Sequence, residues 1–246
     1  MGIEGRQWND VVPLVFESLA NGYHTEHYFN DVIEPALRTL ADQIDEYETK
    51  QEGAWPFVVL HIRAVEKATV EAFALALQSI WERQLRRYLG THKPQDFPLE
   101  KLEKATWGGL QSLFRAWRPF ALDEFDSFEW LDLLQELGNA CRHGDGRASR
   151  VLFKRYPGLW PNWPPKFVAP LPDMIRPPVL PTGEPPFRDI VIPEHFLQRF
   201  SEAIRWFWED IEYLYNRSLQ HPDEYLIQRL DAIRDTWGER GKEITY

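Results

Sequence analysis

Apolar residues recur along most of the chain at the three- and four-residue spacing of an amphipathic helix, and hardly any stretch alternates with the period of two that marks a strand. The longest helical segment runs from Trp55 to Tyr88, with Pro56 in its first turn and Gly90 just past its end. Residues 68–80 in its middle are apolar on almost every side, as in a helix that neighbours cover all round. The pattern therefore predicts an all-α helical bundle built around this segment.

Shorter segments with helical spacing supply the rest of the expected bundle. They cover residues 8–19, 27–50, 99–117, 123–143, 148–153, 194–215 and 222–237. Among these, helix 123–143 and the aromatic-rich helix 194–215 are expected to complete the core. We expect one domain over residues 1–246, with a frayed tail after Gly238.

Proline interrupts this helical pattern in one region, because twelve of the nineteen prolines fall between Pro157 and Pro193. Proline fixes φ and removes a backbone donor, so the region cannot be continuous helix. It also holds apolar residues such as Trp160 and Trp163, which favour an extended arm packed on the bundle, with residues 189–192 as a short strand. The alternative is that the alternation of tryptophan and proline serves as a ligand for a partner protein.

The net charge of −10 excludes a surface that binds nucleic acid everywhere. One local exception stands out, because residues 142–155 carry five cations and a single acid, Asp145. The cations are Arg142, Arg147, Arg150, Lys154 and Arg155. Two interpretations remain open, a solvated basic face and an anion-binding patch for RNA.

Several function classes lack their sequence signals. The chain has no apolar run of the ~18 to 20 residues that cross a bilayer and no secretory signal, which predicts a cytoplasmic protein with no membrane contact. A single cysteine, Cys141, favours a small core residue over a disulfide or a multi-cysteine metal site. No phosphate-binding glycine loop, zinc-protease motif, esterase elbow or EF-hand loop occurs, so we expect no cofactor and no metal.

The chemistry that remains gathers where helix 123–143 ends. Gly144 and Gly146 stop the helix, so Asn139, Arg142 and His143 lie in its last turn. One interpretation is a helix end whose dipole the cations complement. The other is a ribonuclease-like or ligand-binding site, because a histidine base and a fixed cation are the groups that cleave RNA without a metal.

A family resemblance bears on this choice. The segment Gly138-Asn-Ala-Cys-Arg-His-Gly-Asp-Gly146, followed by Ser149, Leu152 and Arg155-Tyr-Pro-Gly-Leu-Trp160, resembles the helix-end motif of bacterial proteins related to the HEPN superfamily. Such proteins are mostly helical bundles, often dimeric, and many are metal-independent ribonucleases in toxin–antitoxin or phage-defence systems. Their motif is an arginine followed after four to six residues by a histidine, with a polar residue directly after the arginine.

Matched position by position, His143 takes the histidine and Asn139 the polar residue, while the arginine position holds Gly138. The resemblance thus implies a HEPN-like ribonuclease in which His143 acts as base or acid and Arg142, with Asn139, holds the phosphate. It equally allows a catalytically inactive HEPN-like module that binds a partner protein or nucleic acid. An unrelated helical interaction protein is the third interpretation. The resemblance and the eleven tryptophans together predict a homodimer.

Overall fold

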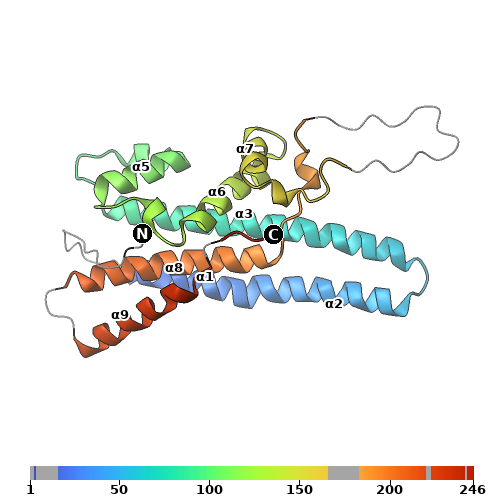
Figure 1. Cartoon of the computed structure of the whole chain (residues 1–246), viewed down its shortest axis with the longest axis horizontal. Coiled ribbons are helices and arrows are strands. Elements are labelled where there is room, and N and C mark those ends of the chain that lie inside the picture. The colour runs from blue at the N-terminus through green and yellow to red at the C-terminus, as the bar shows by residue number, and fades with distance from the viewer. Residues whose placement is uncertain (1–2, 4–15, 166–182, 220–222, 242) are drawn as a thin grey trace.

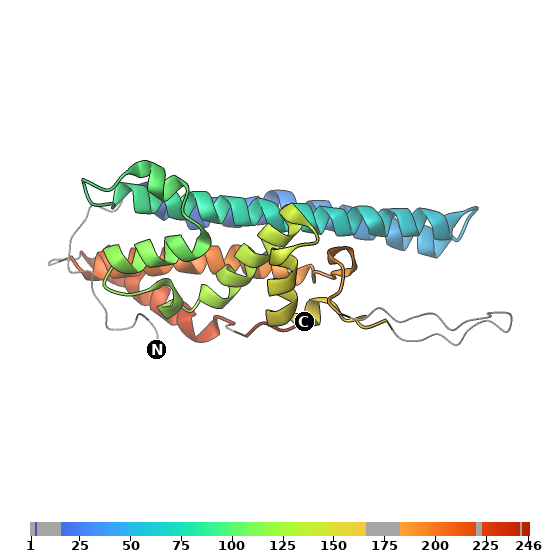
Figure 2. The same ribbon diagram turned by 90° about the horizontal axis from the view of Figure 1, so that it is seen from above.

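A 37-residue helix, α3 (Trp55–Thr91), spans most of the molecule, and the other helices lie along it (Figure 1). The computed structural model describes residues 3, 16–165, 183–219, 223–241 and 243–246. These residues form helices, turns and connecting segments and contain no β-strand, so the predicted all-α bundle is confirmed. The hairpin of α2 and α3 extends beyond the other helices in both views (Figure 1 and Figure 2).

Eight other α-helices, together with short π and 3₁₀ segments, complete the described part of the fold. The remaining α-helices are α1 (Phe16–Tyr28), α2 (Glu34–Lys50), α4 (Leu99–Glu103), α5 (Trp107–Trp117), α6 (Phe128–His143), α7 (Arg147–Arg155), α8 (His195–Arg217) and α9 (Glu224–Thr236). A π-helix, η1 (Phe29–Ile33), joins α1 to α2. Short 3₁₀ turns occupy η2 (Leu122–Glu124), η3 (Pro157–Leu159), η4 (Phe187–Asp189) and η5 (Trp237–Glu239).

The expected break between helices 8–19 and 27–50 is wrong, because the chain is helical from Phe16 to Lys50; residues 8–15 lie outside the described part. Packing of α1 against α8 outweighs the low helix propensity of Gly22. The helix widens before Pro35, where the N–H of Glu34 bonds to the carbonyl of Phe29, five residues back. Proline cannot donate and crowds the preceding turn, which accounts for the π-helix at this place.

The predicted helix 99–117 is also wrong as one element, because it divides into α4 and α5. Thr106 caps α5 by accepting from the N–H of Gly109 at 3.3 Å. The carbonyls of Leu102 and Ala105 bond to the Arg86 guanidinium of α3, the second at 2.7 Å. The Leu102 carbonyl also accepts the N–H of Ala105, and Arg86 adds a side-chain donor to the carbonyls at the break, which stabilises it. Helix α3 itself continues through Gly90, which therefore does not end it as predicted.

The two described ends of the proline-rich region meet on the bundle. The N–H of Val191 donates to the carbonyl of Leu159 at 2.8 Å, and the indole of Trp160 donates to the carbonyl of Pro186. Leu159 and Ile190 are fully buried. The predicted strand 189–192 is wrong, because a single backbone bond replaces a ladder and η4 covers its first residue. Residues 166–182 of the expected arm lie outside the described residues.

Aromatic side chains fill the core between α3, α5, α6 and α8. Trp81 is fully buried and contacts Phe207 edge to face, with ring centroids 4.8 Å apart. Of the ten tryptophans in the described residues, none is exposed. The chain's own core therefore uses its tryptophans, and their number alone does not indicate a dimer.

The expected fraying after Gly238 is wrong for the described residues of this segment. The guanidinium of Arg240 is 1% exposed and bonds at 2.7 Å to the carboxylate of Asp210 on α8. Trp237 donates to the same carboxylate, and the carbonyl of Gly241 accepts from Trp130 of α6. This ion pair joins the tail to Asp210, thirty residues earlier on α8, so the local sequence pattern cannot predict it.

The Arg240 ion pair generates a prediction for stability. Burial raises the pKa of Asp210 to about 6 even with Arg240 beside it. Arg240→Met would leave this carboxyl without its cation, so we expect the free energy of unfolding to fall by ~3 to 5 kcal/mol at pH 8. Because a raised pKa keeps a proton on the folded state, the loss should shrink as the pH falls towards 5.

Urea unfolding at both pH values checks this prediction. Arg234→Met is the matched control, because Arg234 pairs with Asp231 in solvent and its loss should change stability by less than ~1 kcal/mol. Equal effects of the two substitutions would contradict the account of the C-terminal segment.

Candidate functional site

The last turn of α6 carries three candidate catalytic side chains on one face. Asn139, Arg142 and His143 stand three and four residues apart, a spacing that places side chains side by side on a helix. Arg142 and His143 are exposed, and Asn139 is half-buried. Helix geometry therefore brings the three groups together at the C-terminal end of α6.

A tight turn fixes this end of the helix. Gly144 adopts φ +62°, and its N–H bonds to the carbonyl of Ala140 at 2.8 Å. Glycine is favoured there because a side chain is strained at positive φ. Asp145 then accepts the N–H of Phe187 at 2.6 Å, which ties the turn to the segment that leads into α8.

Position 138 faces the long helix, not solvent. A Cβ atom on Gly138 would lie 2.5 Å from Cγ of Gln78, a fully buried residue of α3. No side chain fits at this distance unless the helices move apart. The arginine that the HEPN resemblance expects here is therefore sterically excluded, and glycine at this position is what allows α6 to pack closely on α3.

A buried polar network lies beside this contact and reaches Arg142. Glu82 accepts hydrogen bonds from Gln78 at 2.6 Å and from Gln135 at 2.8 Å, and it pairs with Arg86. Burial alone would raise the pKa of Glu82, but the bonds from Gln135 and Arg86 hold it below its usual range. Because the Gln78 amide group donates to Glu82, its oxygen faces Arg142 and accepts from Nη2 at 3.1 Å. A neutral amide thus orients Arg142 and leaves its positive charge uncompensated.

Helix α7 carries the other predicted RNA-binding residues, and the structure divides them. Arg147, Arg150 and Lys154 are exposed and share one helical face, opposite the buried Ser149 and Leu152. We call these three residues, with Asn139, Arg142 and His143, the α6–α7 corner.

Carboxylates neutralise part of the predicted basic patch. Arg155 pairs with the buried Asp132 of α6, which also accepts from the indole of Trp107 at 2.7 Å. Arg155 therefore joins α7 to α6 and is not free for RNA. Arg150 lies 3.8 Å from Glu184, in a half-exposed ion pair. Among the described residues, the side chain of Lys154 has no hydrogen-bond or ion-pair partner.

The single cysteine lies next to the motif but is poorly suited to chemistry. Cys141 is half-buried, and burial together with the nearby charge of Glu71 raises the pKa of its thiol to about 12. A thiol is nucleophilic only as the thiolate. Cys141 is therefore a packing residue at neutral pH, as the sequence predicted.

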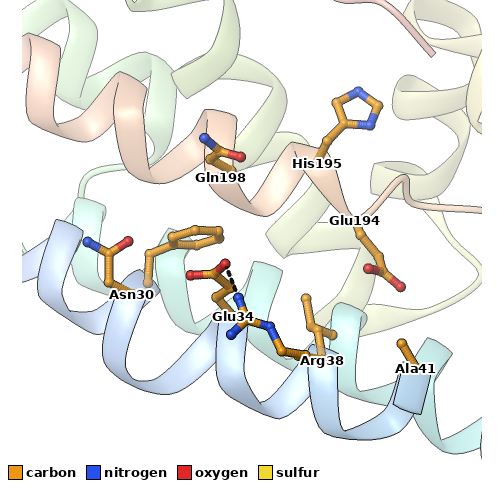
Figure 3. A pocket seen from close by; sticks show the side chains of 9 residues that line it. Asn30, Glu34, Arg38, Ala41, Glu194, His195 and Gln198 are labelled. Atoms are coloured by element: carbon orange, nitrogen blue, oxygen red, sulfur yellow. Dashed lines mark hydrogen bonds and ion pairs between the residues drawn. The ribbon is translucent and has the colours of Figure 1, made fainter.

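A cleft lies away from the C-terminal end of α6, between α2 and the start of α8 (Figure 3). It encloses about 400 Å³, and Arg38 and Glu194 lie on its two walls. Arg38 is paired with Glu34 on its own helix at 2.7 Å. No sequence signal pointed to this cleft, because its walls come from segments far apart in the chain and carry no recognisable spacing.

Neither metal-binding groups, nor membrane-spanning helices, nor similarity to known proteins identifies this chain. Among the described residues, no three His, Cys, Asp or Glu side chains are grouped so that they could hold a metal ion. None of the described helices has the length and apolar character needed to cross a membrane. Comparison of the chain with protein-family models, curated proteins and solved structures finds no match.

The close contact at Gly138 is directly testable. Gly138→Ala should lower the free energy of unfolding by ~1 to 3 kcal/mol, because the new methyl group forces α6 away from Gln78. Gly108→Ala is the control, since a Cβ at Gly108 meets no atom within 4 Å and alanine favours the helix. Denaturant unfolding measures both variants, and a neutral Gly138→Ala would refute the steric argument.

The pKa of Cys141 gives a second test. Because its thiol stays protonated at pH 8, iodoacetamide should alkylate the folded protein at least ~100-fold more slowly than the chain unfolded in guanidinium, where a cysteine pKa is about 8.5. Mass spectrometry follows the reaction. Similar rates in the two states would show that Cys141 is accessible and ionised.

Proposed function

We propose that this chain is a HEPN-like protein whose α6–α7 corner binds RNA and cleaves it without a metal ion. The observation that carries the proposal is that Arg142 and His143 are exposed at the same helix end and neither pairs with a carboxylate among the described residues. A cation and an imidazole held there without a carboxylate partner are available to a phosphate. Arg147 and Lys154 extend the positive surface along α7.

The proposed chemistry uses these groups in two steps of proton transfer. His143 as the neutral base takes the proton of a 2′-hydroxyl, and the 2′-oxygen attacks the adjacent phosphorus. The bond from phosphorus to the 5′-oxygen breaks, and this oxygen leaves with a proton from a protonated histidine. Arg142 stabilises the charge that develops on the phosphate, while Asn139 orients it. The products are a 2′,3′-cyclic phosphate and a free 5′-hydroxyl.

A homodimer would complete this site. One imidazole cannot be base and acid at once, and a two-fold contact would let the second copy supply the protonated histidine. We propose that the protein meets its RNA substrate in the cytoplasm. The resemblance implies a toxin–antitoxin or phage-defence setting, with an antitoxin or another partner protein as inhibitor.

A specific observation favours a second function, a catalytically inactive HEPN-like binding module. The position that should carry the family's arginine is Gly138, and Gln78 fills the space beside it. Arg142 approaches from a different position on the helix and is tethered to the same Gln78. In this alternative the α6–α7 corner binds RNA or a partner but lacks the geometry for cleavage.

Substitution of the two exposed groups separates these functions. His143→Ala should abolish cleavage of a mixed RNA substrate without added metal, while RNA affinity falls little. The melting temperature should hardly change, because an exposed histidine at a helix end contributes only ~0.3 to 1 kcal/mol. Arg142→Ala should weaken both cleavage and binding, since it removes a phosphate contact.

His61→Ala is the matched control, because His61 is an exposed histidine on α3. Binding without cleavage by the wild-type protein would support the inactive module. Wild-type cleavage that neither His143→Ala nor Arg142→Ala reduces would eliminate the assigned site.

A further inference from the structure

A second cleft lies between α3 and the chain segment that leads into α8. It encloses about 340 Å³, at the small end of the ~300 to 1,000 Å³ that small-molecule sites occupy. Its apolar wall comes from Val70 of α3 and from Ile190, Ile192 and Pro193. Its polar wall comes from Glu66, Lys67, Glu71 and Glu194. An apolar wall that faces a few ionisable groups is typical of a site for a small organic molecule.

Two of these acids form a like-charged pair. Glu66 and Glu194 line the same cleft, and their carboxyl groups interact with each other. Partial burial and the neighbouring Glu66 carboxyl raise the pKa of Glu194. A cation between two neighbouring carboxylates relieves their mutual repulsion.

The cations near this pair in the described part of the chain have other partners. Arg63, three residues before Glu66 on α3, donates to Glu48 at 2.9 Å. Lys67 lines the same cleft, but its Nζ donates to the carbonyls of Arg188 and Ile190, the latter at 2.8 Å. Its carboxylate neighbour is Glu71, at 4.0 Å. On the other side of Glu194, Arg38 is paired with Glu34, and the gap of the neighbouring cleft separates it from Glu194 (Figure 3). Neither Glu66 nor Glu194 has an ion pair among the described residues.

We propose that this cleft binds a small organic amine, with the ammonium group between Glu66 and Glu194 and the apolar body against Ile192 and Pro193. The apolar wall distinguishes this ligand from an inorganic cation, which gains nothing from it and needs a fuller set of oxygen ligands. The volume limits the body to a short alkyl chain or a single ring. The proposal is independent of the RNA chemistry at the α6–α7 corner.

Titration with n-butylammonium chloride tests this site in the full chain. At constant ionic strength, NMR or calorimetry should show saturable binding, with shifts centred on residues 66–71 and 190–194. The uncharged 1-butanol should bind at least ~10-fold more weakly, because it lacks the charge-assisted bonds. Equal binding of butanol, displacement by equimolar sodium, or no saturation by butylammonium would each overturn the proposal.

Two substitutions locate the ammonium. Glu194→Gln and Glu66→Gln should each weaken butylammonium binding by roughly tenfold, as expected for the loss of one charged partner. Glu34→Gln is the matched control, because Glu34 lines only the neighbouring cleft and should leave affinity unchanged. An unchanged melting temperature shows that each variant is folded. If Glu34→Gln weakened binding as much as Glu194→Gln, a general acidic surface would explain the effect and the site would be wrong.

Discussion

The contact of α6 with α3 at Gly138 and Gln78 is the constraint on which the candidate site depends. It lets the two helices approach until a Cβ would overlap the Gln78 side chain, and it partly buries Glu82 beside this contact. Burial of a carboxylate is tolerated because Gln78, Gln135 and Arg86 all bond to it. The same Gln78 side chain also accepts a hydrogen bond from Arg142. The contact of Gly138 with Gln78 therefore determines both the position of α6 and the position of the cation at its C-terminal end.

Pairing with carboxylates determines how many cations of residues 142–155 remain available to a ligand. The chain carries a net charge of −10, and its carboxylates pair with some of these cations but not with others. Asp132 pairs with Arg155 and Glu184 lies near Arg150, whereas the partner of Arg142 among the described residues is the neutral amide of Gln78. A nucleic acid would therefore find a small positive area and release few counterions, so its affinity should depend only weakly on salt.

The sequence predicts the helices well where burial of a single face decides, as in α6 and α8, and in α3, whose middle is apolar on almost every side. The prediction is wrong where side chains far away in the sequence determine the local structure. Arg86 stabilises the break between α4 and α5, and Asp210 pairs with Arg240 in a tail that was expected to fray. The motif at His143 is local and visible in the sequence. The steric reason for Gly138 and the pairing of Glu66 with Glu194 are not, because each joins segments far apart in the chain.

The central claim is that the α6–α7 corner is where this protein meets an RNA phosphate. NMR titration with a short RNA whose 2′-hydroxyls are replaced by hydrogen tests it most directly, since binding is then seen without cleavage. The largest chemical-shift changes should fall on the side chains of Arg142 and His143 and on the backbone of α7, and all of them should saturate at the same RNA concentration. Largest shifts elsewhere, or none at saturating oligonucleotide, would contradict it.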